Sequence, residues 1–373
     1  MWQFSYRDEE FLDKTLPVDY EERGQKSRGQ QPWLVHSLSV NALNFCAFSM
    51  VFLGDGDDNS RTDVSEPEEK QSEQKQYQQQ QQQQQQNQNP IPVLIAVPNA
   101  LNSGAIDIFH LPLEKRISTV PAPVDNQTGM VMAVNIFFNT HSKRGVLYVC
   151  SAYEDGHVMV FACQNPGLDD QELENTTIRG NNPWKWKMLY ASRPHTQPVL
   201  GIDISPSMDR FFSSSADAVL AVHPIPSSSS SSSSSLSIID GIVHTPTKIT
   251  NTKHAGQQGL RVRSDGKIFA TAGWDSRMRV YSCKSLNELA VLKWHKEGCF
   301  AVCFADVRVD VEGDIAEHSG YEKLDGHDTQ GAVASQHGLS LATIQRQRYQ
   351  KVQNVHWLVA GSKDGKISLW DIY

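Results

Sequence analysis

A short pattern recurs along this chain: an Asp in a turn, then a strand of alternating residues that ends in an aromatic side chain six positions later. The clearest copies begin at Asp155, Asp275 and Asp364, and Asp217 begins a copy that ends in His223. Strict alternation is the signature of a β-strand with one buried face. Repetition of one small β-unit predicts copies that bury their faces against one another.

A weaker fifth copy has Ser103 in place of the Asp. The five copies end at residues 109, 161, 223, 281 and 370, so the gaps between them are 52, 62, 58 and 89 residues. A blade of a WD40 β-propeller needs roughly 40–45 residues, so every gap includes an insertion. Further alternating strands flank each copy and are separated by Gly, Asp and Ser turns. The sequence therefore predicts an all-β chain, a WD40 β-propeller.

Polar segments interrupt the pattern and keep the hydrophobic content at 39%. They include an unbroken glutamine run, Gln78 to Gln86, and an unbroken serine run, Ser227 to Ser235. Such segments bury too little apolar surface to offset the entropy lost on ordering, so we expect disordered loops there. The predicted organisation is a single propeller domain over residues 1–373, with low-complexity inserts at 54–90, 164–183, 226–252 and 306–354.

The beginning of the chain bears on the expected number of blades. Trp2-Gln3-Phe4 looks like the aromatic end of a third strand whose beginning is missing. WD propellers commonly have seven blades, and an open ring leaves apolar blade faces in water. We therefore expect a chain truncated at its N-terminus relative to seven blades. In the alternative, Val40 onward forms the first of five or six blades.

Composition narrows the class of partner. The net charge of −8 argues against direct binding of nucleic acid or an anionic membrane by the surface as a whole. The charged first 14 residues do not form a signal peptide, and the most apolar stretch, 40–53, is too short to cross a bilayer. Cys299 and Cys303 have no His nearby, so no zinc site is predicted. We expect a soluble intracellular protein without metal or cofactor.

The repeated polar residues predict hydrogen-bonded turns. In WD repeats the Asp of this turn pairs with a His ahead of the first strand and with a hydroxyl residue four positions before the Asp. The expected sets are His195, Ser213 and Asp217; His254, Thr271 and Asp275; and His295 with Asp364, where Ala360 replaces the hydroxyl residue. Asp155 occupies the same turn position, and Trp370 supplies the only Trp at a strand end.

Ser, His and Asp together also invite a hydrolase interpretation. A single active site would not recur at the same spacing in several copies, and the chain has no G-x-S-x-G turn. Mutually satisfied hydrogen-bond networks explain the residues better, and we predict no enzymatic activity.

The final third of the chain resembles one family of WD-repeat proteins. The blocks that carry the resemblance are 269–281, 289–295 and 358–370, with Gly273-Trp274-Asp275 in the first and Gly361-Ser362-Lys363-Asp364-Gly365 in the last. They look like the ASTRA-associated WD-repeat proteins of fungi, which are related to the animal G-protein beta-subunit-like protein. Residues 2–17 and 102–121 also resemble this family, so the likeness covers the chain outside the inserts.

The resemblance implies a non-enzymatic scaffold subunit of the nuclear ASTRA complex, which is linked to chromatin remodelling and to the maturation of phosphatidylinositol-3-kinase-related kinases. The implied partners are Tel2-Tti-type co-chaperones, RuvB-like AAA+ ATPases and a kinase-like scaffold. The implied compartment is the nucleus, with the cytoplasm as a second location. The alternative is a signalling adaptor of the G-protein beta type. No heptad repeat for a gamma-chain coiled coil precedes the repeats.

In propellers of this type, the residue just before the turn Asp tends to lie on the narrow face of the ring. Here these residues are Glu154, Ala216, Trp274 and Lys363. Trp274 is the leading candidate for partner binding because an exposed Trp is a common interface anchor. Glu154 and Lys363 are the further candidates. The competing interpretation places Trp274 inside its blade as packing.

Overall fold

The computed structural model describes residues 2–3, 33–34, 36–38, 40, 46–53, 91–123, 128–139, 145–164, 166, 184–226, 238–239, 241–306 and 356–372. The glutamine and serine runs, the insert at 54–90 and almost all of the inserts at 164–183 and 306–354 lie outside these residues. The chain divides into two compact units, one mainly of Met1–Ala191 and one mainly of Ser192–Ser227 and His244–Tyr373.

The first unit contains two larger sheets. Sheet 1 has the strand order β3 (Ser49–Phe52), β4 (Val93–Pro98), β5 (Ile106–Leu111) and β6 (Lys115–Val120). Sheet 2 consists of β7 (Val131–Phe138), β8 (Leu147–Tyr153), β9 (Val158–Cys163) and β10 (Trp186–Ser192), extended by β15 (Ile242–Val243) and β14 (Ile238–Ile239). The two sheets are antiparallel except for the parallel pairing of β10 with β15 in the second. A two-stranded pair joins β1 (Trp2–Gln3) to β2 (Trp33–Leu34).

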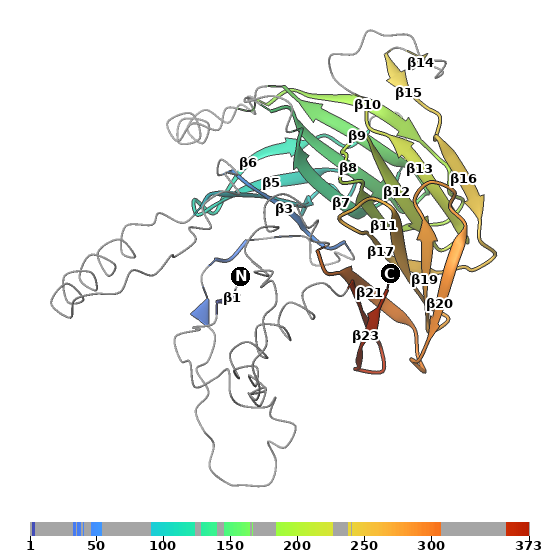
Figure 1. Cartoon of the computed structure of the whole chain (residues 1–373). Helices are drawn as coiled ribbons and strands as arrows, with labels where there is room; N and C mark the ends of the chain where they lie inside the picture. Colours follow the sequence, from blue (N-terminus) through green and yellow to red (C-terminus); the bar gives the residue numbers. More distant parts are fainter. Residues whose placement is uncertain are drawn as a thin grey trace, which may run out of the picture. The chain divides into compact units, whose positions relative to one another are not determined.

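The second unit contains three antiparallel sheets (Figure 1). Sheet 3 is β11 (Val199–Ile204), β12 (Arg210–Ser215), β13 (Val219–Pro224) and β16 (Lys248–Asn251). Sheet 4 is β17 (Gln257–Val262), β18 (Ile268–Gly273), β19 (Arg277–Ser282) and β20 (Glu288–Lys293). Sheet 5 has three strands in the described part of the chain: β21 (Cys299–Phe304), β22 (Trp357–Ser362) and β23 (Ile367–Asp371).

Each Asp pattern lies on the hairpin between the second and third strands of a sheet, as the sequence predicts for WD blades. The outer strands expected at 117–120, 186–190 and 288–292 are β6, β10 and β20. Sheet 1 starts at Ser49, and the number of blades and the N-terminal truncation stay predictions.

One predicted insert needs correction. Residues 226–252 were expected to be a disordered loop, yet Lys248–Asn251 form β16, the outer strand of sheet 3. This strand carries little apolar surface, and its four residues pair with β13 through Val222↔Lys248 to Val219↔Asn251. Hydrogen bonds to the edge of an existing sheet can order an outer strand. Such a strand can therefore form even where its amino-acid composition does not indicate one.

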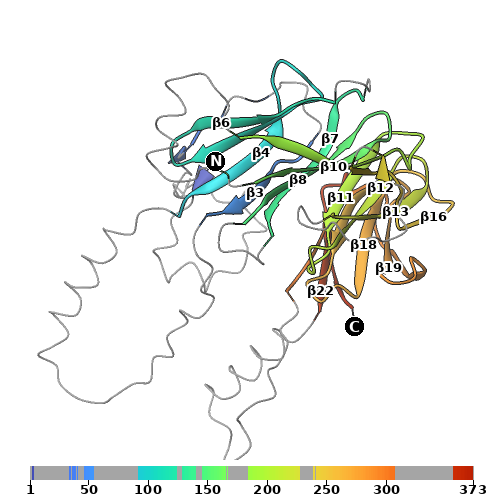
Figure 2. The same ribbon diagram turned by 90° about the horizontal axis from the view of Figure 1, so that it is seen from above.

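The sheets of the second unit, with β18 in the middle one, are seen from above in Figure 2. They pack face to face, and the alternation along β18 sends its side chains into two different cores. Ile268, Ala270 and Ala272 lie in a core shared with sheet 5. Phe269 points the other way, into a core shared with sheet 3, with its ring 5.0 Å from that of Phe212 and 5.2 Å from that of Tyr281. Full burial of a Phe side chain contributes about 2–3 kcal/mol.

A β-bulge recurs in the first strand of sheets 2 to 5. The pairing register shifts between Val131 and Ala133, Val199 and Gly201, Gln257 and Leu260, and Cys299 and Ala301. A bulge adds an unpaired residue and re-aims side chains beside it. Gln258 and Phe300 are bulge residues of β17 and β21, two strands that lie side by side (Figure 1).

Candidate partner-binding site

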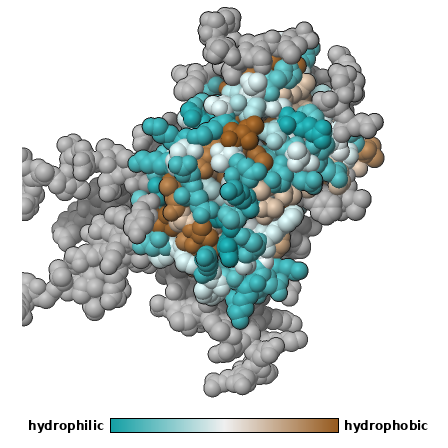
Figure 3. All heavy atoms as spheres, turned by 90° about the vertical axis from the view of Figure 1, so that its right-hand side faces the viewer, coloured by the Kyte–Doolittle hydropathy of each residue, from teal (hydrophilic) through white to brown (hydrophobic). Residues whose placement is uncertain are grey.

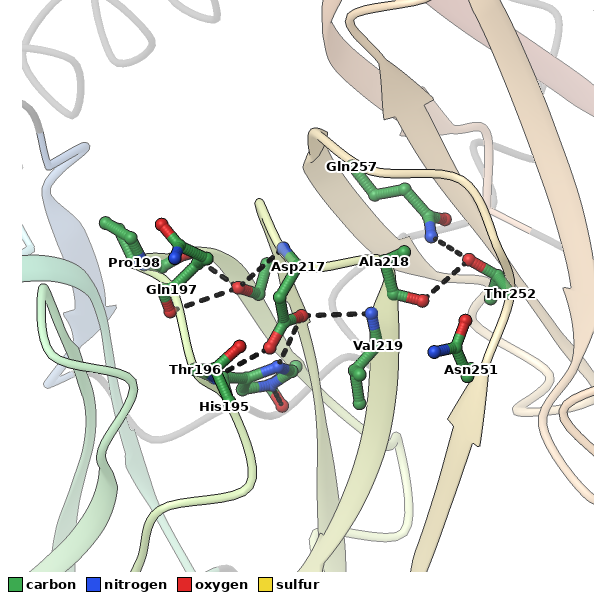
Figure 4. A network of polar contacts seen from close by, with 12 residues as sticks. His195, Thr196, Gln197, Pro198, Asp217, Ala218, Val219, Asn251, Thr252 and Gln257 are labelled. Carbon is green, nitrogen blue, oxygen red and sulfur yellow. Dashed lines mark hydrogen bonds and ion pairs between the residues drawn. The ribbon is translucent and has the colours of Figure 1, made fainter.

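The turn of sheet 3 holds a continuous chain of hydrogen bonds (Figure 4). The Asp217 carboxylate accepts from the backbone amides of Thr196 at 2.8 Å and Val219 at 3.0 Å, and it lies 3.2 Å from His195 Nδ1. His195 Nε2 is 2.8 Å from Ser213 Oγ, which is 2.8 Å from His223 Nε2. The structure thus brings His195, Ser213 and Asp217 together and adds His223.

The electrostatics of this chain follow from burial. Burial alone would raise the pKa of Asp217, but hydrogen bonds from His195 and from two backbone amides lower it to about 2. Burial, together with the nearby His195, lowers the pKa of His223 well below 6.5. With His223 neutral, each group can donate to the next, from His223 through Ser213 and His195 to Asp217.

The turn of sheet 5 is closed by a hydroxyl group that the sequence reasoning missed. His295 Nδ1 lies 3.2 Å from Asp364, and His295 Nε2 lies 2.9 Å from Ser368 Oγ. The same oxygen accepts from Trp370 Nε1 at 2.9 Å. Ser368 pairs directly with Ala360 across the ladder, so the missing hydroxyl on one strand is supplied by its neighbour on the next. The register of a tight Asp364-Gly365 hairpin would have revealed it.

Sheet 4 does not assemble the expected set of His254, Thr271 and Asp275. Arg279, only 1% exposed, donates to both oxygens of Asp275 at 3.1 and 2.6 Å. Thr271 donates instead to Gln257 Oε1 at 2.8 Å, and the His254 ring lies 3.9 Å from Glu288. The physical reason is that Arg279 faces Thr271 across the β18–β19 ladder. From this position its guanidinium bonds Asp275, so that Asp275 pairs with Arg279 and not with His254 and Thr271.

In sheet 2, the candidates Asp155 and Glu154 are both engaged close to their own turn. Asp155 bonds the backbone and the ring of His157, at 3.1 and 2.6 Å. Glu154 accepts from the backbone amide of Met130 at 3.2 Å. This local bond leaves Glu154 a weaker candidate for partner contact than its sequence position suggested.

Sheet 1 has a buried carboxylate that the sequence reasoning did not single out. Asp107 accepts from Asn99 at 2.9 Å and from Thr119 at 2.7 Å. It stands four residues after Ser103, as Arg279 and Ser368 stand four residues after their Asp. The third-strand position four residues after the turn residue therefore carries a different polar group in sheets 1, 4 and 5. This four-residue spacing is the sequence feature that could have indicated Asp107.

Trp274 is held on the surface of sheet 4 by three contacts. Its indole lies on Gly256, where a Cβ atom would overlap the ring, and its backbone amide donates to the Gly256 carbonyl at 3.0 Å. Indole Nε1 donates to Gln258 Oε1 at 2.8 Å. The side chain is nevertheless 48% exposed. Trp274 is thus oriented rather than buried, in contrast to the packing interpretation.

Phe300 and Lys363 lie close to Trp274, and Gly298 connects the three residues by its contacts. A Cβ atom on Gly298 would lie 3.1 Å from the Trp274 carbonyl oxygen and 3.4 Å from the Phe300 ring. The Gly298 carbonyl accepts from the Lys363 amide at 3.0 Å. Phe300 is 40% exposed. We call Trp274, Gln258, Phe300, Lys363 and the intervening Gly298 the Trp274 surface.

A second half-exposed Trp in the same unit lies in a different setting. Trp294 is 54% exposed, stacks edge-on against His295 at 4.9 Å and has Lys366 Nζ 5.7 Å from its ring centre. Exposed apolar residues also occur on the outer strands β16 and β20, at Ile249 and Leu289. From the side that carries these strands, separate hydrophobic areas interrupt a mainly hydrophilic surface (Figure 3).

Two further observations concern metal ions and membranes, and both are made of the described residues alone. No group of three or more His, Cys, Asp or Glu side chains there is placed to hold a metal ion. Among the same residues, no helix has the length and apolar character needed to cross a bilayer.

Comparison with known proteins identifies the family. The model of the WD domain, G-beta repeat, matches residues 339–371. ASTRA-associated protein 1 of Aspergillus niger is 54% identical over 380 aligned positions, which cover 100% of this chain and 79% of the relative, and that of Aspergillus flavus is 52% identical with the same coverage. Mouse guanine nucleotide-binding protein subunit beta-like protein 1 is 28% identical over 57% of this chain and 54% of its own. The repeated Asp hairpins, the WD-repeat match and this full-length identity show that the chain belongs to the ASTRA-associated protein 1 family of WD-repeat proteins.

Proposed function

We propose that this chain is a non-enzymatic scaffold subunit of the ASTRA complex, linked to chromatin remodelling and to the maturation of phosphatidylinositol-3-kinase-related kinases in the nucleus. Membership of the family supports the proposal through the names of its relatives, which associate them with ASTRA. The partners proposed are Tel2-Tti-type co-chaperones, RuvB-like AAA+ ATPases and a kinase-like scaffold.

The observation that carries a binding role is the exposure of an ordered indole. Trp274 leaves 48% of its side chain accessible, although Gly256 and Gln258 fix its orientation. A rigid aromatic group at a surface provides a large contact area with little entropy to lose on binding, which is why Trp is enriched among interface hot spots. We propose Trp274 as the main partner contact, with Lys363 beside it.

The proposal is tested by affinity purification of the tagged full chain from fungal nuclei. Wild-type protein is expected to recover the co-chaperones and the AAA+ ATPases, whereas the Trp274→Ala variant recovers at least tenfold less of them. Trp294→Ala is the matched control, because Trp294 is similarly exposed and contacts His295 and Lys366 rather than Gly256 and Gln258. Equal recovery by wild type and Trp274→Ala would remove Trp274 from the interface.

The alternative is a signalling adaptor related to G-protein beta subunits, and the likeness to the mouse protein favours it. The same purification separates the two. Recovery of a small gamma-type chain, with none of the ASTRA-associated proteins, would favour the adaptor.

A further inference from the structure

We propose that Gln257, a fully buried residue of β17, is the positioning residue that holds the Trp274 indole in its binding orientation. The inference rests on the proposed function, because it names the residue that keeps the partner contact at Trp274 ordered. Three observations support it: the residue type at this position, the complete pairing of its side-chain amide, and the contacts that its two chain neighbours make with Trp274.

Gln257 is a polar residue at a position that is apolar in other sheets. It begins β17 and pairs with Gly273, two residues before Asp275. The residues that pair at the same place in sheets 2, 3 and 5 are buried and apolar: Val131, Val199 and Cys299. Burying an amide is costly unless its hydrogen bonds are made, so a Gln at this position needs partners within the protein.

All the hydrogen-bonding positions of the Gln257 amide are used. Its Oε1 accepts from Thr271 Oγ1 at 2.8 Å and from the Tyr281 hydroxyl at 3.1 Å. Burial raises the pKa of Tyr281, so the phenol keeps the proton that it donates. The amide Nε2 donates to Thr252 Oγ1 at 2.7 Å and to the His254 carbonyl at 3.1 Å. An amide with every donor and acceptor satisfied has one preferred orientation, which fixes the backbone that carries it.

The bonds from Nε2 also hold the segment that leads to Gly256. Thr252 follows β16, and its hydroxyl donates to the Ala218 carbonyl in the turn of sheet 3 at 2.9 Å (Figure 4). The segment is thus held by sheet 3 at Thr252, and by the Gln257 amide at Thr252 and His254. Displacing Gly256 would therefore leave polar groups of a buried amide without partners, which is costly.

The two chain neighbours of Gln257 make the contacts that orient Trp274. The indole lies on Gly256, whose carbonyl accepts from the Trp274 amide at 3.0 Å. The Gln258 side-chain oxygen accepts from indole Nε1 at 2.8 Å. Because residues 256 and 258 are joined through Gln257, the buried amide that anchors Gln257 also sets where both contacts are made.

The test follows the Trp274 ring directly in the full chain, labelled with 5-fluorotryptophan and examined by fluorine-19 NMR. The resonance missing from Trp274→Phe assigns the Trp274 signal, and Trp294→Phe assigns an internal reference in the same way. Gln257→Met removes the hydrogen bonds of the amide and keeps a side chain of similar size. We expect it to shift or broaden the Trp274 resonance and to leave the Trp294 resonance in place.

Ser213→Ala is the matched control for stability, because Ser213 is also fully buried and holds two hydrogen bonds within sheet 3. Both variants are expected to lower the melting temperature, but only Gln257→Met is expected to move the Trp274 resonance. A Gln257→Met protein that melts as Ser213→Ala does, with the wild-type Trp274 resonance, would show that Gln257 only stabilises sheet 4 and would overturn the proposal. Should Gln257→Met fail to fold, Thr252→Val decides: it removes one acceptor of the amide, and an unmoved Trp274 resonance overturns the proposal equally.

Partner recovery separates this inference from the proposed function. Gln257→Met keeps the Trp274 side chain, and we expect it to recover about three- to tenfold less of the ASTRA proteins, since a mobile indole must be ordered on binding. If the resonance moves and recovery stays at the wild-type level, Gln257 positions Trp274 and the Trp274 contact of the proposed function fails. If Trp274→Ala releases the ASTRA proteins while Gln257→Met changes neither resonance nor recovery, the proposed function stands and this inference fails.

Discussion

Ser368 faces Ala360 across the β22–β23 ladder, and its hydroxyl lies 2.9 Å from His295 Nε2. In sheet 3 the corresponding hydroxyl belongs to Ser213, on the second strand, and Ala221 stands opposite. The two sheets thus place the same group on opposite members of one cross-strand pair. Because both positions reach the buried His, the hydrogen bond is fixed by geometry and the residue that provides it can vary.

Exchange of this hydroxyl between strands is the first prediction. Ser368→Ala leaves His295 and Trp370 without their shared acceptor or donor, and we expect it to lower the free energy of unfolding by about 1–3 kcal/mol. Adding Ala360→Ser to the same variant is expected to recover most of the loss, because it recreates the arrangement of sheet 3. Urea denaturation followed by tryptophan fluorescence measures both. A double variant as unstable as the single one would contradict the interpretation.

For the Arg279–Asp275 pair, we predict that removing one partner destabilises the fold more than removing the other. Asp275→Ala leaves a guanidinium at 1% exposure with only Glu288, 3.4 Å from its Nε, whereas Arg279→Met leaves carboxylates that are more than one third exposed. An uncompensated buried charge costs about 3–5 kcal/mol, while hydrated carboxylates cost little. Asp275→Ala should therefore be the more destabilising change in thermal unfolding. The reverse order would contradict the assignment of the larger cost to the buried guanidinium.

Gly256 and Gly365 provide a matched test of the indole contact. Both have φ above +70°, but a Cβ at Gly256 meets the Trp274 ring and one at Gly365 meets nothing within 4 Å. Ala at either position pays backbone strain of about 1–2 kcal/mol. Only Gly256→Ala should also displace the indole, and we expect a shift in Trp274 fluorescence, measured against a Trp274→Phe background. Identical spectra for the two Ala variants would argue against the contact.

The buried His223 makes stability depend on pH. Its pKa in the folded chain lies well below 6.5, so the unfolded chain binds the proton first as pH falls. Stability is then complete above about pH 6.5 and declines below it, down to the folded pKa. When the pH is lowered from about 7.5 to about 5.5, we expect the melting temperature of His223→Phe to fall less than that of the wild type. Asp217 adds a second loss at lower pH, between its ordinary pKa of 3.8 and about 2.

The sequence predicted the features that repeat and missed those that depend on pairing. Asp217, His195 and Ser213 occur at a repeated spacing, and that spacing indicated their contact. Ser368 and Arg279 lie across a ladder from the expected residues, so their roles appear only once strand register is known. The strand at Lys248–Asn251 follows a serine run and is ordered by pairing with its neighbour β13. Amino-acid composition alone does not indicate this pairing.

Partner recovery and folding measured on the same preparations of Trp274→Ala test the account most directly. Full-chain wild type, Trp274→Ala and Trp294→Ala would be purified from fungal nuclei, and each preparation assayed for co-purifying ASTRA proteins and for its melting temperature. The account predicts that Trp274→Ala melts within a few degrees of wild type and loses its partners, while Trp294→Ala keeps them. A Trp274→Ala protein that keeps its partners, or one that loses them only because it unfolds, would contradict a surface role for Trp274.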